Sequence, residues 1–78
     1  MRVVLYSRPG CHLCDVARRV LVAERQDHAF ELDEVDVQGD EGLERVYGIR
    51  IPVVEIDGEE RFEYEVDPQE LSRILRGV

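Results

Sequence analysis

Apolar and polar residues alternate along the chain in patterns that predict seven secondary-structure elements. Residues 3–6 form a continuous apolar run, which is typical of a strand buried on both faces. From Cys11 onward, apolar residues recur at spacings of three and four, and this period predicts a helix that ends near residues 25–27. The apolar positions of this helix are Leu13, Val16, Ala17, Val20 and Leu21. The turn between the strand and the helix contains Pro9 and Gly10.

Residues 30–37 predict a second strand, but the alternation shifts by one position in its middle. The apolar residues before and after the shift are Phe30, Leu32, Val35 and Val37. A bulge at Asp33-Glu34 would return all of these side chains to one face of the sheet. We therefore expect a bulge or a bend at this point.

Three local signals divide the second half of the chain. Asp40 is a favourable cap for a short helix that ends at Gly48. The Asp-Gly pair at residues 57–58 is typical of a tight hairpin and follows an extended apolar segment at residues 49–56. The Asp-Pro pair at residues 67–68 starts the last helix. The expected inward positions are Leu43, Val46 and Tyr47 in the short helix, Phe62, Tyr64 and Val66 in the last strand, and Leu71, Ile74 and Leu75 in the last helix.

The element order is therefore β-α-β-α-β-β-α, which predicts an α/β fold in one domain spanning residues 1–78. The first β-α-β unit should be parallel and right-handed. The hairpin should close one edge of a four-stranded mixed sheet. With helices on both faces of this sheet, the expected architecture is a three-layer sandwich.

Composition and charge narrow the classes of function. The chain has 78 residues, of which 36% are charged and 44% hydrophobic, and this suits one globular domain. It contains no apolar run that could cross a membrane and no secretory signal segment, and we expect a cytoplasmic protein. A net charge of −8 argues against nucleic acid and against an anionic membrane as partners, because both are bound by clustered basic residues.

The chain has two cysteines, Cys11 and Cys14, which are too close in sequence to act as an effective structural cross-link. Closing so small a ring would stabilise the fold by about 2 kcal/mol, against about 3–5 kcal/mol for loops of 15–100 residues. The pair therefore favours reactivity or metal binding. Structural zinc sites require four ligands, and His12 and His28 are the further candidates. We expect no metal site within one chain, while a metal shared between two chains stays open.

The Cys-x-x-Cys spacing follows a predicted strand and opens a predicted helix, a context typical of thiol redox sites. The first turn of a helix presents unpaired N–H groups and partial positive charge, which favour a thiolate. Cβ atoms three positions apart inside a helix lie about 5–6 Å apart, whereas a disulfide needs about 3.5–4.5 Å. Cys11 should therefore lie at the cap as the exposed nucleophile, and Cys14 in the first turn, where it resolves the mixed disulfide. Arg8 and His12 flank Cys11, and either could stabilise its thiolate.

The Ile51-Pro52 pair is the second unusual feature. It begins an apolar strand, although proline removes a hydrogen-bond donor from a sheet. A cis bond in a tight bend and a trans bond at a sheet edge both explain it. The residues alone leave both alternatives open.

These features together resemble the thioredoxin fold and, more closely, the glutaredoxin-like proteins. The resemblance rests on residues 5–14 (Leu-Tyr-Ser-Arg-Pro-Gly-Cys-His-Leu-Cys), on residues 51–53 (Ile-Pro-Val) and on the hairpin at residues 57–58. It implies a thiol–disulfide oxidoreductase in electron transport and cell redox homeostasis. It also implies a cis Pro52 beside the cysteines and an Ile51 backbone that pairs with an extended substrate. The substrate-binding residues implied in this way are Arg8, His12, Ile51 and Pro52.

The sequence departs from glutaredoxins at residues 63–68 (Glu-Tyr-Glu-Val-Asp-Pro). Glutaredoxins have a glycine pair and an acidic residue here, where the γ-glutamyl end of glutathione binds. This chain has no glycine pair, Pro68 lacks an N–H donor, and two further carboxylates face an anionic tripeptide. This difference in sequence argues against a glutathione-binding site at these residues.

The charge is unevenly divided along the chain. Residues 1–28 carry five arginines and three carboxylates, whereas residues 29–78 carry five arginines and fifteen carboxylates. The expected substrate is therefore a protein disulfide with a basic or neutral surface, and an upstream thiol reductant supplies the electrons. We expect no tightly bound cofactor and a monomeric chain. The alternative is a non-catalytic binding or redox-sensing module on the same fold.

Overall fold

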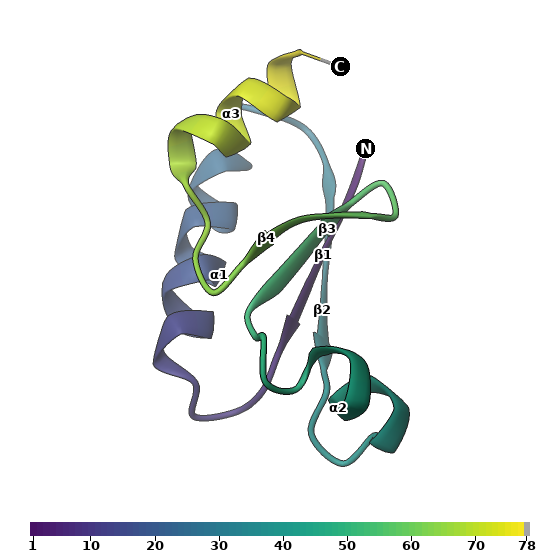
Figure 1. The fold of residues 1–78 in the computed structure, drawn as a ribbon. Coiled ribbons are helices and arrows are strands. Elements are labelled where there is room, and N and C mark those ends of the chain that lie inside the picture. Colours follow the sequence, from purple (N-terminus) through teal and green to yellow (C-terminus); the bar gives the residue numbers. More distant parts are fainter. Residues whose placement is uncertain (78) are drawn as a thin grey trace.

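The computed structural model describes residues 1–77 and contains the seven elements in the predicted order (Figure 1). The strands are β1 (Arg2–Ser7), β2 (Glu31–Asp36), β3 (Val53–Ile56) and β4 (Glu59–Glu63). The helices are α1 (His12–Glu24), α2 (Glu41–Tyr47) and α3 (Pro68–Arg76). No helix in this part of the chain is both long and apolar enough to span a membrane.

The four strands form one mixed sheet in the order β2-β1-β3-β4. β1 is parallel to β2 and antiparallel to β3, and β4 pairs antiparallel with β3 at the edge. Neighbouring side chains of a strand point to opposite faces. Leu5 lies in the core with Leu21 of α1 and Leu71 of α3, whereas Tyr6 stacks on Tyr47 of α2. α1 and α3 therefore cover one face of the sheet and α2 the other, which confirms the predicted three-layer architecture (Figure 1).

The inward face of α1 differs from the predicted face at its N-terminal end. The buried positions are Cys14, Ala17 and Leu21, whereas Leu13 and Val16 are 49% and 36% exposed. The three buried positions lie on one stripe of the 3.6-residue period. The reactive Cys14 is thus also the first core residue of the helix, and the two residues beside that stripe remain at the surface.

The bulge predicted in the second strand is absent. β1 and β2 pair in one continuous register along their whole length, and Phe30 and Val37 are buried just beyond the two ends of β2. Glu34 lies on the same face as Leu32, and Arg18 of α1 binds its carboxylate there. The apolar pattern shifts because an ion-paired glutamate occupies this face, and the backbone stays regular.

The local signals of the second half place each turn as expected. Asp40 caps α2 by accepting a hydrogen bond from the Leu43 N–H (3.1 Å). Asp57 and Gly58 have φ values of 52° and 84°, the left-handed pair that a two-residue hairpin requires. Asp67 caps α3 by accepting a hydrogen bond from the N–H two residues further on (3.0 Å).

Two apolar residues of the second half that were predicted to point inward lie at the surface, and so does Ile49, the first residue of the predicted extended segment. Val46 is 52% exposed, because α2 contacts the sheet through Tyr47. Tyr64 is 48% exposed and follows the end of β4 with a φ of 69°, so it does not continue the strand. Ile49 is 91% exposed in the turn after α2, since β3 begins at Val53.

Candidate functional site

The two cysteines lie where β1 leads into α1. Cys11 is the N-cap residue of α1 in an extended conformation (φ −93°, ψ 109°), and Cys14 lies in the first turn. They form a disulfide with Cα atoms 5.2 Å apart. Sγ of Cys11 accepts a hydrogen bond from the backbone N–H of Cys14 (3.2 Å). This sulfur therefore takes the place of the side-chain oxygen that commonly caps a helix.

The two sulfurs differ in exposure. Cys14 is fully buried in the core, whereas Cys11 is half-buried at the surface. A thiolate at Cys11 would keep the N–H donor of Cys14 and the partial positive charge of the helix N-terminus, and both favour the ionised form. This asymmetry suits an attacking and a resolving cysteine.

The Ile51–Pro52 segment lies at the same end of the sheet. Its peptide bond is cis, so the alternative that the sequence left open is decided. Val53 pairs with Tyr6, which places the buried Pro52 opposite the end of β1, from which a short loop leads to Cys11. Within residues 1–77, the backbone N–H and C=O of the half-buried Ile51 form no hydrogen bond. Both groups are therefore available for another chain.

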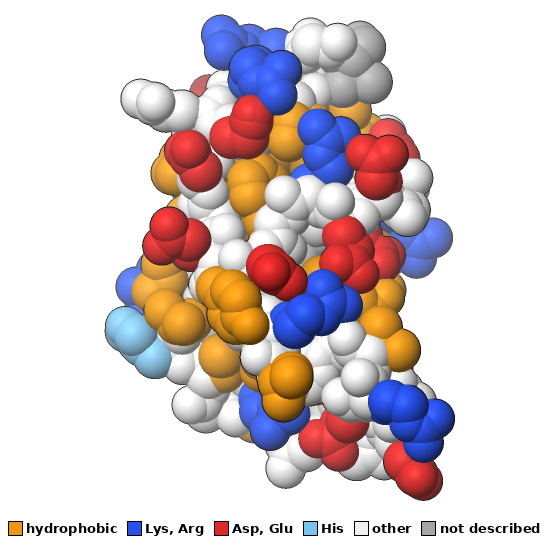
Figure 2. All heavy atoms as spheres, in the orientation of Figure 1, with side chains coloured by type: hydrophobic (Ala, Val, Ile, Leu, Met, Phe, Trp, Pro, Cys, Tyr) orange, Lys and Arg blue, Asp and Glu red, His pale blue; other side chains and the backbone are white. Residues whose placement is uncertain are grey.

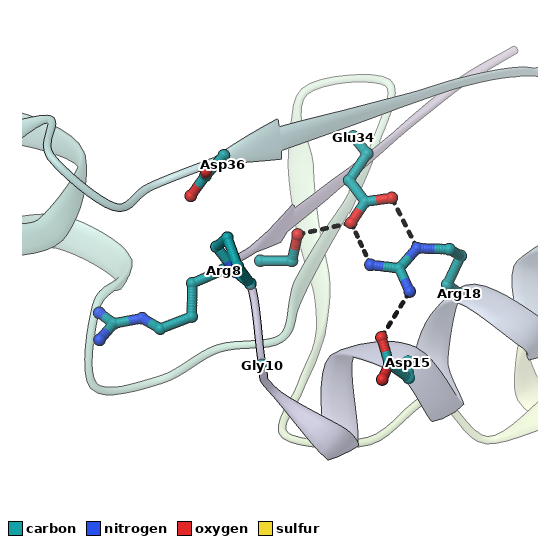
Figure 3. Close-up of a pocket in the computed structure, with 8 residues that line it drawn as sticks. Arg8, Gly10, Asp15, Arg18, Glu34 and Asp36 are labelled. Atoms are coloured by element: carbon teal, nitrogen blue, oxygen red, sulfur yellow. Dashed lines mark hydrogen bonds and ion pairs between the residues drawn. The ribbon is translucent and has the colours of Figure 1, made fainter.

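The two residues expected to flank the thiolate have different surroundings. The guanidinium of Arg8 donates to Glu44 Oε1 (3.2 Å) and to the carbonyl of Gly48 (3.4 Å), so it binds α2 rather than the sulfurs. Figure 3 shows this side chain extending away from Gly10 and the start of α1. His12 is exposed in the first turn of α1. No group of three or more potential metal ligands is gathered within the described residues 1–77.

A cavity of about 370 Å³ lies between the loop before Cys11, the first turns of α1 and the end of β2 (Figure 3). Arg18 spans it, donating through Nε to Glu34 (2.7 Å) and through Nη1 to Asp15 (2.7 Å). The buried Ser7 donates to the same Glu34 carboxylate (2.7 Å). This network joins β1, β2 and the turn that carries the cysteines. Sequence reasoning missed it, although the phase shift at Glu34 was its signal.

The network makes Glu34 an acid-sensitive contact. The hydrogen bond from Arg18 lowers the pKa of Glu34 below its ordinary value; desolvation opposes this shift, and the Ser7 hydroxyl assists it. A group whose folded pKa is depressed stabilises the fold above its unfolded pKa, and that stability is lost as the pH falls through the folded pKa. The contribution should therefore be complete at pH 7 and decline as the pH falls from about 5 toward 3.

We expect Glu34→Gln to lower the free energy of unfolding by about 1 kcal/mol at pH 7, the size of a partly exposed ion pair. The difference from the unmodified protein should shrink as the pH falls below about 5. Urea unfolding at several pH values measures both effects. Glu31→Gln, at an exposed position of the same strand, is the matched control. Equal losses from the two variants at pH 7 would refute the role of the network.

Comparison with protein families gives one match that covers almost the whole chain. The model of the glutaredoxin-like domain (DUF836) matches residues 2–76. Among curated proteins, the uncharacterized protein Rv0508 of Mycobacterium tuberculosis is 33% identical over 75 residues. The match covers 90% of this chain and 77% of that protein.

Solved structures have the same architecture. The X-ray structure of protein XcR50 from X. campestris has 33% sequence identity and a TM-score of 0.78, and the match covers 97% of each chain. The glutaredoxin-like protein NrdH-redoxin from Escherichia coli matches with a TM-score of 0.62 and 20% identity, over 95% of each chain. At that identity the second match concerns the fold alone.

Proposed function

Because this chain belongs to the glutaredoxin-like domain family (DUF836), we propose that it is a thiol–disulfide oxidoreductase that acts on protein disulfides. The observation that carries the proposal is the asymmetric pair at the start of α1. Cys11 is half-buried and its sulfur accepts the N–H of Cys14, while Cys14 itself is fully buried. This difference in exposure supports Cys11 as the sulfur that reacts with a partner and Cys14 as the sulfur that reacts afterwards.

In the proposed reaction, the thiolate of Cys11 attacks one sulfur of a substrate disulfide. The substrate S–S bond breaks, its second sulfur leaves as a thiolate that takes up a proton, and a mixed disulfide with Cys11 forms. Cys14 then loses its proton and attacks the Cys11 sulfur. The substrate sulfur that was bound to Cys11 leaves as a thiolate and takes up a proton, and the Cys11–Cys14 disulfide forms. Two electrons have passed to the substrate, and an upstream thiol reductant restores the dithiol.

The proposed substrate lies extended along the Ile51–Pro52 segment. The unused N–H and C=O of Ile51 would pair with its backbone, as in other cases of strand addition to a sheet. His12 is exposed at the start of α1, directly after Cys11, and we include it on that ground. We include Arg8 because its loop leads to Cys11, although its guanidinium is held by α2 in this structure.

Glutathione is a poor candidate for the same site. Pro68 at the start of α3 offers no N–H donor, and Glu63 and Glu65 add negative charge close by. We further propose that the protein is a cytoplasmic monomer without a tightly bound cofactor. It would serve electron transport and cell redox homeostasis.

A single-turnover thiol count tests this function. We expect the reduced protein, freed of other reductants and mixed with an excess of a disulfide-containing protein such as insulin, to lose two thiols per chain. Two thiols should appear on the substrate at the same rate, and a sample alkylated beforehand should give none. If the protein keeps both thiols over hours while the substrate stays oxidised, the proposed function is wrong.

A further inference from the structure

Tyr64 lies directly against the segment proposed to bind the substrate. Its backbone N–H donates to the carbonyl of Pro52 (2.8 Å), immediately after Glu63 has paired with Val53. The residues that follow β4 therefore run alongside the Ile51–Pro52 segment. A substrate chain paired with Ile51 would have Tyr64 and its neighbours within reach.

The backbone presents the Tyr64 ring at the surface. The N–H of Glu65 donates to the carbonyl of Glu63 (2.8 Å), which makes a three-residue turn with Tyr64 at its centre. Tyr64 has a φ of 69°, a value that non-glycine residues adopt uncommonly. Its side chain is 48% exposed, and its hydroxyl donates to the carbonyl of the exposed Ile49 (3.4 Å). The ring is thus held in place with much of its surface open to solvent.

The charge around this ring is negative. The guanidinium of Arg50 is shared between Glu60 and Glu63. Glu65 is exposed, and within residues 1–77 its carboxylate has neither a hydrogen bond nor a salt bridge. Figure 2 shows apolar side chains gathered near the middle of this face, with both acidic and basic side chains beside them. Next to the substrate segment, the chain therefore carries an exposed aromatic residue and, at the following position, an exposed carboxylate without an ion-pair partner among the described residues.

We propose that Tyr64 and Glu65 form a subsite for a positively charged side chain next to the substrate disulfide. The proposal rests on the proposed function and names its substrate class: protein segments with arginine, or less favourably lysine, beside a cysteine. The face of a tyrosine ring attracts a guanidinium and stacks on it. The Glu65 carboxylate supplies a charged acceptor. The same carboxylate repels an anionic tripeptide, so one arrangement favours the protein substrate and disfavours glutathione.

Three disulfide peptides that differ at one position beside a cysteine test the subsite. That position is arginine, glutamine or glutamate. We expect kcat/KM for the arginine peptide to exceed that for the glutamine peptide about threefold, as for an exposed charge pair. The glutamate peptide should be slower than the glutamine peptide by a similar factor. In about 0.5 M salt the differences should fall below about twofold, because exposed charges are screened.

Two variants test whether Glu65 and Tyr64 cause the preference for the arginine peptide. Glu65→Gln removes the charge, and Tyr64→Asn removes the ring with a residue that tolerates positive φ. Each should bring the arginine-to-glutamine ratio to about 1.5 or less. The ratio is taken within each variant, so a change in its overall rate does not alter the comparison, and urea unfolding checks that each variant is folded. Asp27→Asn makes the same charge change beyond the far end of α1 and should leave the ratio unchanged.

The possible outcomes separate the two proposals. If the three peptides are reduced at one rate, or if the arginine preference survives in both variants, the subsite is wrong and the oxidoreductase function stands. An equal loss of preference in Asp27→Asn would also overturn the subsite, because the effect would then come from net charge. If no peptide is reduced, the proposed function fails and the subsite fails with it.

Discussion

Replacing Cys11 with serine is expected to abolish disulfide exchange, lowering turnover by more than about 10³-fold. A hydroxyl cannot replace the thiolate as the attacking and leaving group in this reaction. The fold should survive, because serine is a favourable N-cap and can accept the hydrogen bond that the Cys11 sulfur accepts from Cys14. Reduction of insulin with dithiothreitol as the electron source, followed over the uncatalysed rate, measures the effect.

The unfolding curve of the same variant is the control for this result. Loss of activity with an unchanged urea midpoint would assign the effect to chemistry rather than to folding. Normal turnover by Cys11→Ser would remove Cys11 from the reaction and, with it, the proposed order of attack and resolution.

Leu21→Ala is expected to lower the free energy of unfolding by about 3 kcal/mol, within the range of about 2–5 kcal/mol seen for buried leucines. Leu21 is fully buried in the core between α1, the sheet and α3. A domain of this length has a total stability of about 4–12 kcal/mol. The substitution should therefore remove a large part of the stability of the fold. Urea unfolding of the oxidised protein measures the loss.

Leu13→Ala is the matched control, because it makes the same chemical change in the same helix. Leu13 is 49% exposed, so we expect a loss of less than about 1 kcal/mol. Similar losses from the two variants would mean that Leu13 lies in the core. The inward face of α1 would then be the one predicted from the sequence, not the one in the structure.

The order of the elements could be predicted from the sequence because its signals are local. Asp40 and Asp67 cap the helices that follow them, and the Asp-Gly pair at residues 57–58 turns the hairpin. Which residues of α1 are buried was harder to predict. Its apolar residues form a wider stripe around the helix than the part that packs against the core. Cys14 was not among the apolar positions predicted for this helix, yet it is a core residue.

Contacts between residues distant in sequence could not be predicted. Arg18 and Glu34 meet because α1 packs over β2, and this contact explains the shift that we interpreted as a bulge. Arg8 was expected to be able to stabilise the Cys11 thiolate, and the fold also brings Glu44 close enough to bind its guanidinium. Neither pair lies within one helix or one hairpin. The phase shift in the second strand marks Glu34 as unusual, but no local pattern identifies its partner.

Some features of the candidate site could likewise be predicted from the sequence, and others could not. The positions of Cys11 at the cap and Cys14 in the first turn follow from the distances that a disulfide requires, and the structure has both. The cis bond before Pro52 was left open by the residues, and the structure decided it. The hairpin at residues 57–58 already brings the end of the last strand close to Ile51-Pro52, but the alternation gave no sign of the turn at Tyr64, which leaves this residue half exposed.

The mixed disulfide itself tests the central claim most directly. The reduced Cys14→Ser variant is mixed with a protein that carries one disulfide, and the products are measured by intact mass and peptide mapping. We predict a covalent adduct with the summed mass of the two proteins, joined through Cys11 and released by dithiothreitol. If the variant stays unreacted while its Cys11 thiol is intact, the account of this protein as a thiol–disulfide oxidoreductase is contradicted.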